Sequence, residues 1–137
     1  MRFLKNTATK TAIKAILLVG LASTGALMAQ NSGLTRTLVG RGDVSVPGRE
    51  AVVARVDVAP GAKAGRHSHP GDEISYIIEG EGKLLIDGEP PRVVKAGDSF
   101  IIPAGVIHDA YNDGTVPIKL VGVYVVEKGK PLATPAP

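Results

Sequence analysis

Residues 61–80 read GAKAGRHSHPGDEISYIIEG, and the histidines in this stretch are spaced for a shared task. His67 and His69 lie two positions apart, and side chains two apart in an extended strand project from the same face. If residues 66–69 are extended, both imidazoles point to one side while Arg66 and Ser68 point to the other. A strand with this pattern offers two metal ligands side by side.

A carboxylate follows the two histidines. Pro70-Gly71-Asp72 has the composition of a turn, so we expect the next strand to fold back and to bring Glu73 opposite the pair. Two imidazoles and one carboxylate suit Fe(II), Mn(II), Ni(II) or Zn(II). Taken alone, the pattern fits equally well a pair of surface histidines without a ligand role.

A second stretch, residues 97–112, reads GDSFIIPAGVIHDAYN. The spacing of its glycines, Pro103, His108 and Asn112, taken with the spacing in residues 61–80, resembles the two sequence motifs of the cupin family. The resemblance covers about half of the chain after residue 29. It implies an all-β protein with a single double-stranded β-helix, the jelly-roll barrel of the cupins.

The resemblance also assigns roles to individual residues. It implies that one divalent metal ion (Fe, Mn, Ni, Zn or Cu) is held by His67, His69, Glu73 and His108. It further implies that five residues make turns at the corners of the barrel, where glycine permits backbone angles that a side chain would penalise: Gly61, Gly80, Gly97, Gly105 and Pro103. Asn112 ends the second motif at a turn position and is expected to form that turn rather than to bind metal.

The residue pattern independently favours strands. No stretch after residue 29 keeps helical periodicity for three turns, and glycines and prolines interrupt the chain at short intervals. Within residues 52–58, alternation predicts that Ala54, Val56 and Val58 are buried while Arg55 and Asp57 face water. Further strands are expected at residues 74–78, 83–86, 92–95, 99–102, 107–111 and 118–126, which together favour a sandwich or barrel.

The first 29 residues have the three-part plan of a secretory signal peptide. Four spaced cations precede an apolar run at residues 15–22, and small residues lead to a cleavage site after Ala29. An uncleaved membrane anchor and a cytosolic amphipathic helix are the alternatives. A helical signal peptide at residues 1–29 predicts a periplasmic or secreted protein with no stable membrane association after cleavage.

The remaining residues divide into three parts. We expect a loosely ordered N-terminal arm at residues 30–48, the barrel at residues 49–127 and a flexible, proline-rich tail at residues 128–137. This mature chain carries 12 basic and 13 acidic residues, scattered among one another, so nucleic-acid binding is disfavoured. The absence of cysteine excludes disulfides, thiolate metal sites and cysteine nucleophiles.

The ligand set predicts an open, exchangeable metal site, because closed structural sites are typically tetrahedral and rich in cysteine. Our leading interpretation is an oxidoreductase of dioxygenase type that acts on a small organic substrate inside the barrel. The alternatives are a non-catalytic module that binds a small ligand or sugar, and a structural barrel with vestigial histidines. The family also includes decarboxylases, isomerases and lyases, and it typically forms homodimers through a sheet edge.

The walls of the site are expected to come from inward-facing strand residues. The candidates are Tyr76, Phe100, Ile102 and Tyr111, each of which fits core packing as well as substrate contact. Asp72 and Asp109 neighbour the expected ligands in sequence, but adjacent strand residues face opposite ways. They therefore receive no catalytic role, and the catalytic residues are left unassigned.

Overall fold

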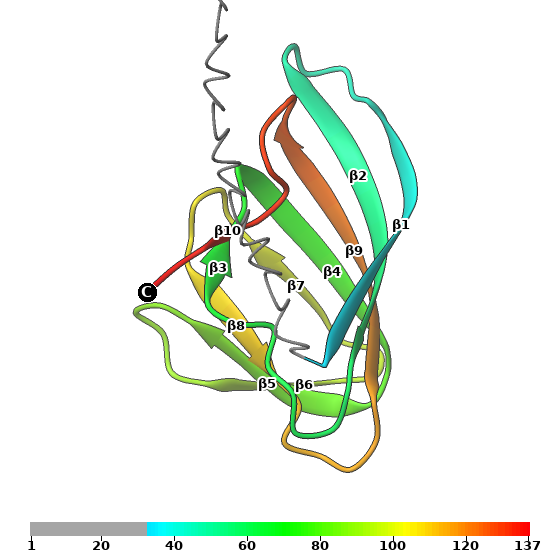
Figure 1. The fold of residues 1–137 in the computed structure, drawn as a ribbon, viewed down its shortest axis with the longest axis vertical. Helices are drawn as coiled ribbons and strands as arrows, with labels where there is room; N and C mark the ends of the chain where they lie inside the picture. The colour runs from blue at the N-terminus through cyan, green and yellow to red at the C-terminus, as the bar shows by residue number, and fades with distance from the viewer. Residues whose placement is uncertain (1–32) are drawn as a thin grey trace, which may run out of the picture.

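The computed structural model describes residues 33–137, which form ten strands in two antiparallel sheets (Figure 1). The strands are β1 (Leu34–Asp43), β2 (Arg49–Val58), β3 (His67–Ser68), β4 (Gly71–Glu79), β5 (Glu81–Ile86), β6 (Arg92–Lys95), β7 (Ser99–Ile102), β8 (His108–Tyr111), β9 (Ile118–Glu127) and β10 (Thr134–Pro135). The first sheet has the order β1-β2-β9-β4-β7 and the second has the order β10-β3-β8-β5-β6. The all-β prediction is confirmed for this part of the chain.

The predicted signal peptide at residues 1–29 lies outside the described residues. Within residues 33–137, no helix is long and apolar enough to cross a membrane.

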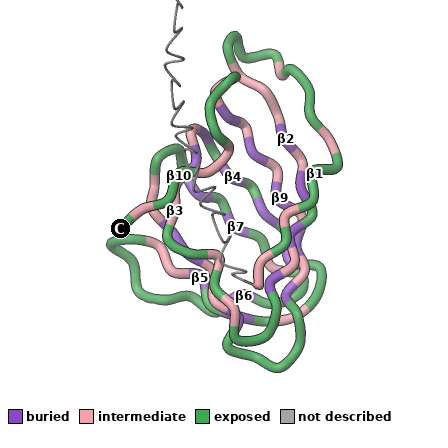
Figure 2. The backbone as a smooth tube through the Cα atoms, viewed as in Figure 1, coloured by how far each residue is buried: buried purple, intermediate pink, exposed green. Residues whose placement is uncertain are grey.

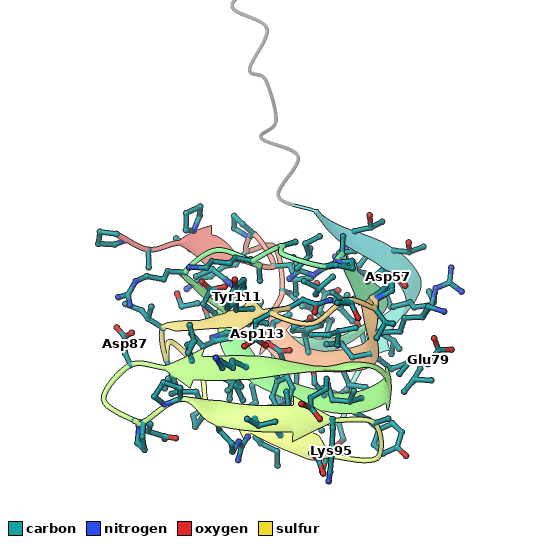
Figure 3. The ribbon with its side chains drawn as sticks, turned by 90° about the horizontal axis from the view of Figure 1, so that it is seen from below. Asp57, Glu79, Asp87, Lys95, Tyr111 and Asp113 are labelled. Atoms are coloured by element: carbon teal, nitrogen blue, oxygen red, sulfur yellow. The ribbon has the colours of Figure 1, made fainter. Side chains whose placement is uncertain are left out.

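The core lies between the two sheets and follows from the alternation of strand residues. In β2, Ala54, Val56 and Val58 are buried as predicted, while Arg55 is exposed and Asp57 is half-buried. Strand β9 alternates in the same way along its whole length, and it pairs with β2 on one side and with β4 on the other. Figure 2 shows the buried positions recurring along these strands, whereas Figure 3 shows Glu79, Asp87 and Lys95 at the periphery.

The turn-making glycines behave as predicted. Gly61, Gly80, Gly97 and Gly105 all have positive φ angles, between 74° and 92°. At Gly80 a second constraint applies, because a Cβ atom there would lie 2.5 Å from the carbonyl oxygen of Pro117. The close approach of two backbones and the left-handed conformation both require glycine at this corner.

Asn112 organises the loop that follows β8, also as predicted. Its buried amide donates hydrogen bonds to the carbonyl oxygens of Val58 (2.9 Å) and Val116 (2.8 Å). Its side-chain oxygen accepts a hydrogen bond from the backbone N–H of Gly114 at 3.0 Å. These bonds satisfy the side chain and tie the loop to the end of β2.

The expectation of a loosely ordered arm is wrong for residues 34–43. They form β1, which pairs with β2 from Leu34 opposite Val58 to Asp43 opposite Glu50. The segment has few apolar residues because β1 is an edge strand with much of its surface in water. Backbone hydrogen bonds to β2, rather than side-chain burial, account for its order.

The expectation of a flexible tail is also wrong. Strand β10 pairs with β3, and the Ala136 N–H donates to the carbonyl oxygen of Arg66 at 2.9 Å. The Arg66 side chain in turn donates to the carbonyl oxygen of Pro137 at 2.7 Å. Proline is tolerated here because β10 is an edge strand, where a missing N–H leaves no ladder bond unmade. The C-terminus therefore lies beside β3 (Figure 1).

The link between β3 and β4 differs from the predicted turn. Instead of folding back beside β3, the chain passes at Pro70 from the second sheet into the first, where β4 pairs with β9 and β7. Gly71 permits this crossing, because a Cβ atom there would clash with the carbonyl oxygen of Val125. Glu73 consequently faces the histidines from the opposite sheet.

Candidate metal centre

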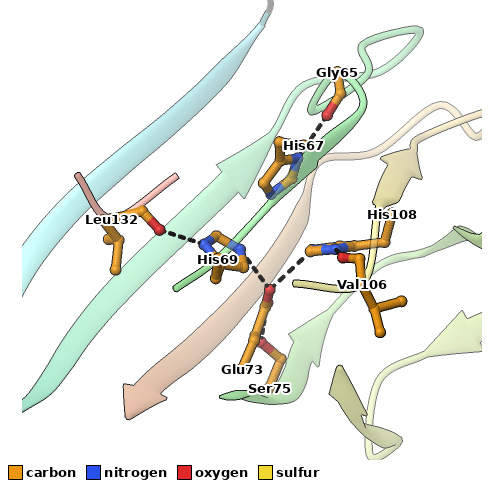
Figure 4. A network of polar contacts seen from close by, with 8 residues as sticks. All are labelled: Gly65, His67, His69, Glu73, Ser75, Val106, His108 and Leu132. Atoms are coloured by element: carbon orange, nitrogen blue, oxygen red, sulfur yellow. Dashed lines mark hydrogen bonds and ion pairs between the residues drawn. The ribbon is translucent and has the colours of Figure 1, made fainter. Parts of the chain in front are cut away.

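Four side chains that the sequence singled out converge between the two sheets (Figure 4). His67 lies on β3, His69 follows it, and His108 lies on the neighbouring β8, where it pairs directly with His67. Glu73 reaches in from β4. One potential ligand atom from each residue lies within 4.8 Å of all the others, a cluster that could hold a metal ion.

Each imidazole is oriented by a backbone carbonyl. The Nδ1 atoms of His67 and His69 lie 2.6 Å from the carbonyl oxygens of Gly65 and Leu132, and Nδ1 of His108 lies 3.0 Å from that of Val106. Because a carbonyl oxygen only accepts hydrogen bonds, each Nδ1 must carry the proton. The Nε2 atoms of the neutral rings are then left with a free lone pair, which is the form in which histidine binds metals.

Glu73 is held at the centre of this cluster. Its Oε2 atom lies 3.0 Å from Nε2 of His69 and 3.1 Å from Nε2 of His108. Ser75, two residues along β4, donates a hydrogen bond to Oε1 at 2.6 Å. Burial by itself would raise the pKa of Glu73, but contacts with His108, His69 and Ser75 outweigh burial and hold it well below its usual range. Glu73 is therefore a carboxylate.

The pKa values of His67 and His108 are shifted in opposite directions. The pKa of His67 is lowered by burial and further by the charges of His108, His69 and Arg36. Burial also acts to lower the pKa of His108, but the hydrogen bond to Glu73 reverses this effect and raises it. The imidazole of His67 therefore stays neutral more readily than that of His108.

The donor set fits a divalent cation. Nε2 of His69 is buried, makes no well-aligned hydrogen bond and lies beside the carboxylate of Glu73. A neutral imidazole nitrogen and a carboxylate oxygen both present lone pairs, so their close approach needs a proton or a metal ion between them. Nitrogen and oxygen donors of this kind match Fe, Mn, Ni, Zn and Cu.

A small cavity of about 30 Å³ adjoins the four side chains. Its walls are largely apolar and include Val56, Leu84, Phe100 and Leu120. Such a volume holds about two water molecules. A second cavity, of about 230 Å³, shares His67 with the first and extends outward to Ala133 and Pro135 of the C-terminal tail.

Tyr124 is part of the site, although the sequence analysis did not select it. Its ring centre lies 4.8 Å from that of His69, and it pairs with Glu73 across β9 and β4. Burial, followed by the negative charge of Glu73, raises the pKa of Tyr124 to about 12, so the phenol stays protonated. The alternation of residues 118–126 could have indicated this position, because Tyr124 lies an even number of residues from Ile118 and Leu120 and so faces the same side of the strand.

The four predicted wall residues divide in two. Phe100 and Ile102 are buried, and Phe100 lines the small cavity. Tyr76 faces outward and is 53% exposed, so its selection was wrong. Tyr111 is half-buried and packs against Lys63, whose Nζ atom lies 5.0 Å from the ring centre.

Asp72 and Asp109 hold loops rather than the cluster. Asp72 accepts a hydrogen bond from the Ala104 N–H at 3.0 Å, and Asp109 accepts one from the Gly65 N–H at 2.9 Å. Gly65 is also the residue whose carbonyl orients His67. Asp109 therefore supports the cluster indirectly.

Comparison with known proteins identifies relatives of this sequence. The sequence matches the family described as Cupin domain over residues 54–126. Germin-like protein subfamily 2 member 2 of Arabidopsis thaliana is 28% identical over 107 residues, which cover 69% of this chain and 47% of that protein. The first curated relatives are covered only in part, over 34% to 55% of their lengths.

Two solved structures show the same architecture. A conserved protein with a double-stranded β-helix domain from Klebsiella pneumoniae has a TM-score of 0.62 at 26% identity, covering 76% of this chain and 87% of that one. Recombinant oxalate oxidase in complex with glycolate has a TM-score of 0.62 at 28% identity, covering 78% and 57%. The predicted double-stranded β-helix is confirmed by these likenesses.

Proposed function

This chain belongs to the cupin domain family, and from that premise we propose that it is an exported metalloprotein that catalyses a dioxygenase-type oxidation of a small organic compound. One divalent metal ion is held by four residues: His67, His69, Glu73 and His108. The substrate enters through the larger cavity beside His67.

One observation carries the metal assignment. All three histidines donate Nδ1–H to backbone carbonyls, and the Nε2 atoms of His69 and His108 both lie within 3.1 Å of one carboxylate oxygen of Glu73. A histidine that merely fills a core would be expected to use both ring nitrogens in hydrogen bonds, whereas the buried Nε2 of His69 has no well-aligned partner. Fixing of the tautomer by a second hydrogen bond is typical of metal-binding histidines.

When bound, such an ion supplies Lewis-acid polarisation or, in a redox-active form, a meeting point for dioxygen and substrate. Residues of the chain exclude water, donate a hydrogen bond and orient a ligand. The apolar wall of the small cavity limits water near the ligands, and Tyr124 keeps its proton and offers an O–H donor beside His69. Ser75 fixes the carboxylate of Glu73.

The likeness to oxalate oxidase supports oxidative chemistry on a small, oxygen-bearing substrate. Oxalate and glycolate are therefore the first compounds to test, followed by catechols, flavonoids and β-diketones. The chain spans only part of these relatives, so the activity of the whole relative remains a proposal for this protein.

A binding module is the second candidate. Among the described residues, Arg36 and Tyr124 are the only titratable side chains lining the small cavity besides three of the proposed ligands. Neither is a ready general acid or base near neutral pH, since a guanidinium has no lone pair to accept a proton and burial raises the pKa of Tyr124 to about 12. Binding without turnover needs no such group.

The test begins with metal. We expect purified protein to bind one equivalent of Mn(II) or Fe(II) in calorimetry, and we expect His67→Ala, His108→Ala and Glu73→Gln to weaken binding at least tenfold. Glu81→Gln, which alters an exposed carboxylate on β5, is the matched control and should bind normally. A wild-type protein that takes up no divalent ion would refute the proposal.

Oxygen uptake by the loaded protein then separates the two candidates. Consumption of dioxygen with any compound of the panel, lost in His108→Ala, supports the enzyme. Saturable binding without consumption supports the binding module.

Export is tested separately. The proposal rests on the cations and the apolar run within residues 1–29. Protein recovered from the cell envelope or medium should begin near Gln30, whereas an intact Met1 would contradict cleavage.

A further inference from the structure

Arg36 occupies an unusual position on β1. Its side chain lines both the small cavity beside the proposed ligands and the larger cavity that leads outward. Its Nε atom is buried and has no hydrogen-bond partner. No carboxylate within residues 33–137 forms an ion pair with it.

Two other arginines in the described chain are paired with carboxylates. The guanidinium of Arg66 binds both carboxylate oxygens of Asp87, at 2.7 and 2.9 Å, and Arg41 lies 3.6 Å from Glu50. The side chain of Arg36 instead lies against Tyr124, whose ring centre is 5.7 Å from the guanidinium carbon and whose phenol is also a hydrogen-bonding neighbour of the guanidinium. Leaving a buried donor of a charged group without an acceptor is costly, so the site favours an incoming acceptor.

The charges around the cavities point to the sign of that acceptor. Among the residues lining them, Arg36 and Glu73 carry opposite charges, and the charge of Arg66 is already neutralised by Asp87. A bound divalent ion would add an excess of positive charge. A carboxylate neutralises this excess and matches the planar, forked donors of a guanidinium.

We propose that Arg36 is a specificity-determining residue that selects small carboxylates as ligands of this site. The inference deepens the proposed function by naming a substrate class and rests on it for the metal ion. The anion would bind where the two cavities meet, with its carboxylate on Arg36 and the rest of the molecule near His67. The limited volume of the inner cavity restricts the part that enters there to a few atoms.

The first test needs no metal. In a proton–nitrogen correlation spectrum, the Arg36 Nε–H signal, assigned by its loss in Arg36→Gln, should shift and saturate as acetate is added to metal-free protein. Acetamide has the same size without the charge and should bind at least about tenfold more weakly, because a charge-assisted hydrogen bond is lost. Equal responses to acetate and acetamide would overturn the proposal.

The second test uses protein loaded with Mn(II). Broadening of the acetate methyl proton signal reports binding near the paramagnetic ion, and Arg36→Gln should weaken acetate binding at least about tenfold while Mn(II) affinity does not fall, because the substitution removes a positive charge near the ligands. Arg55→Gln removes the same charge from an exposed position on β2 and should have no effect. Arg36→Lys keeps the charge but loses the Nε–H donor, so its affinity should be intermediate.

The two tests fail in different ways. If Mn(II) does not bind, the proposed function fails while the metal-free titration still decides the role of Arg36. If Mn(II) binds but folded Arg36→Gln and Arg36→Lys take up acetate as tightly as wild type, the carboxylate proposal fails and the metal site stands.

Discussion

The two sheets of this barrel contribute different kinds of residues: the first contributes most of the hydrophobic core and the second most of the candidate metal ligands. The first sheet provides all but two of the buried hydrophobic residues of the described chain, the exceptions being Leu84 on β5 and Val94 on β6. The second sheet, with the segment that follows β3, provides all three histidines. Glu73 is the point at which the first sheet reaches into the cluster. Stability and chemistry are thus largely carried by separate layers.

Strand length explains the division. Three strands of the first sheet have ten residues each and pair over nearly their full lengths, and two of them, β2 and β9, place many side chains in the core. The strands of the second sheet have two to six residues. Its short strands leave carbonyl groups near their ends, and those of Gly65, Val106 and Leu132 orient the histidines.

The largest effect is expected from the core of the first sheet. Ile77→Ala removes a side chain that is only 1% exposed and should lower the free energy of unfolding by about 2 to 5 kcal/mol. Urea denaturation measures this change. Ile78→Ala, at the next position but 46% exposed, is the control and should cost much less. A larger loss in Ile78→Ala than in Ile77→Ala would show that the assigned faces of β4 are reversed.

Metal removal should act through the second sheet. With Mn(II) at a hundredfold excess over its dissociation constant, chelation should lower the free energy of unfolding by about 2.7 kcal/mol, because the ion binds only the folded state. Thermal unfolding with and without chelator checks this. In Glu73→Gln, where the ion no longer binds tightly, the chelator should have little effect; a stability loss as large as in wild type would contradict the assignment.

Truncation of the tail tests a more distant support. Removal of residues 131–137 takes away the Leu132 carbonyl that orients His69, and we expect metal affinity to fall by about 10- to 100-fold. Competition with a metal indicator measures the change. Removal of Pro137 alone leaves Leu132 and β10 in place and is the control. Unchanged affinity in the longer truncation would mean that the tail merely covers the site.

The smallest effect is expected at the surface of the second sheet. Asp87→Asn breaks the ion pair with Arg66, in which both side chains are more than 40% exposed. Exposed pairs contribute less than about 1 kcal/mol, so unfolding and metal affinity should barely change. A large loss of metal affinity would show that this ion pair, rather than strand pairing and the Leu132 contact, holds the tail over the site.

Local patterns predicted the middle of the chain well. Seven expected strands are present because their alternation and turn residues act over a few positions, and the four glycines at corners have the positive φ angles that were expected. Predictions failed at the two ends. Strand β1 and strand β10 are edge strands with little apolar patterning, and their order depends on pairing, with the next strand β2 for β1 and with the distant β3 for β10.

The candidate site, like the strands, could be predicted only where short-range spacing identified its residues. The spacing of His67, His69, Glu73 and His108 identified residues that the fold brings together. Arg36 and the Leu132 carbonyl gave no signal, since one lies on an edge strand and the other is a backbone group. Tyr124 could have been selected from the parity of β9, whereas Tyr76 was chosen without a register and faces water.

By itself, the sequence determined the strand-rich class, the turn positions and the group of candidate ligands, because each depends on residue type and short-range spacing. The tertiary structure alone decided that the chain crosses between sheets at Pro70, which sets Glu73 against the histidines from the opposite side. It also decided that β1 and the tail enclose the larger cavity. These features depend on contacts between distant segments, whose register a linear pattern does not encode.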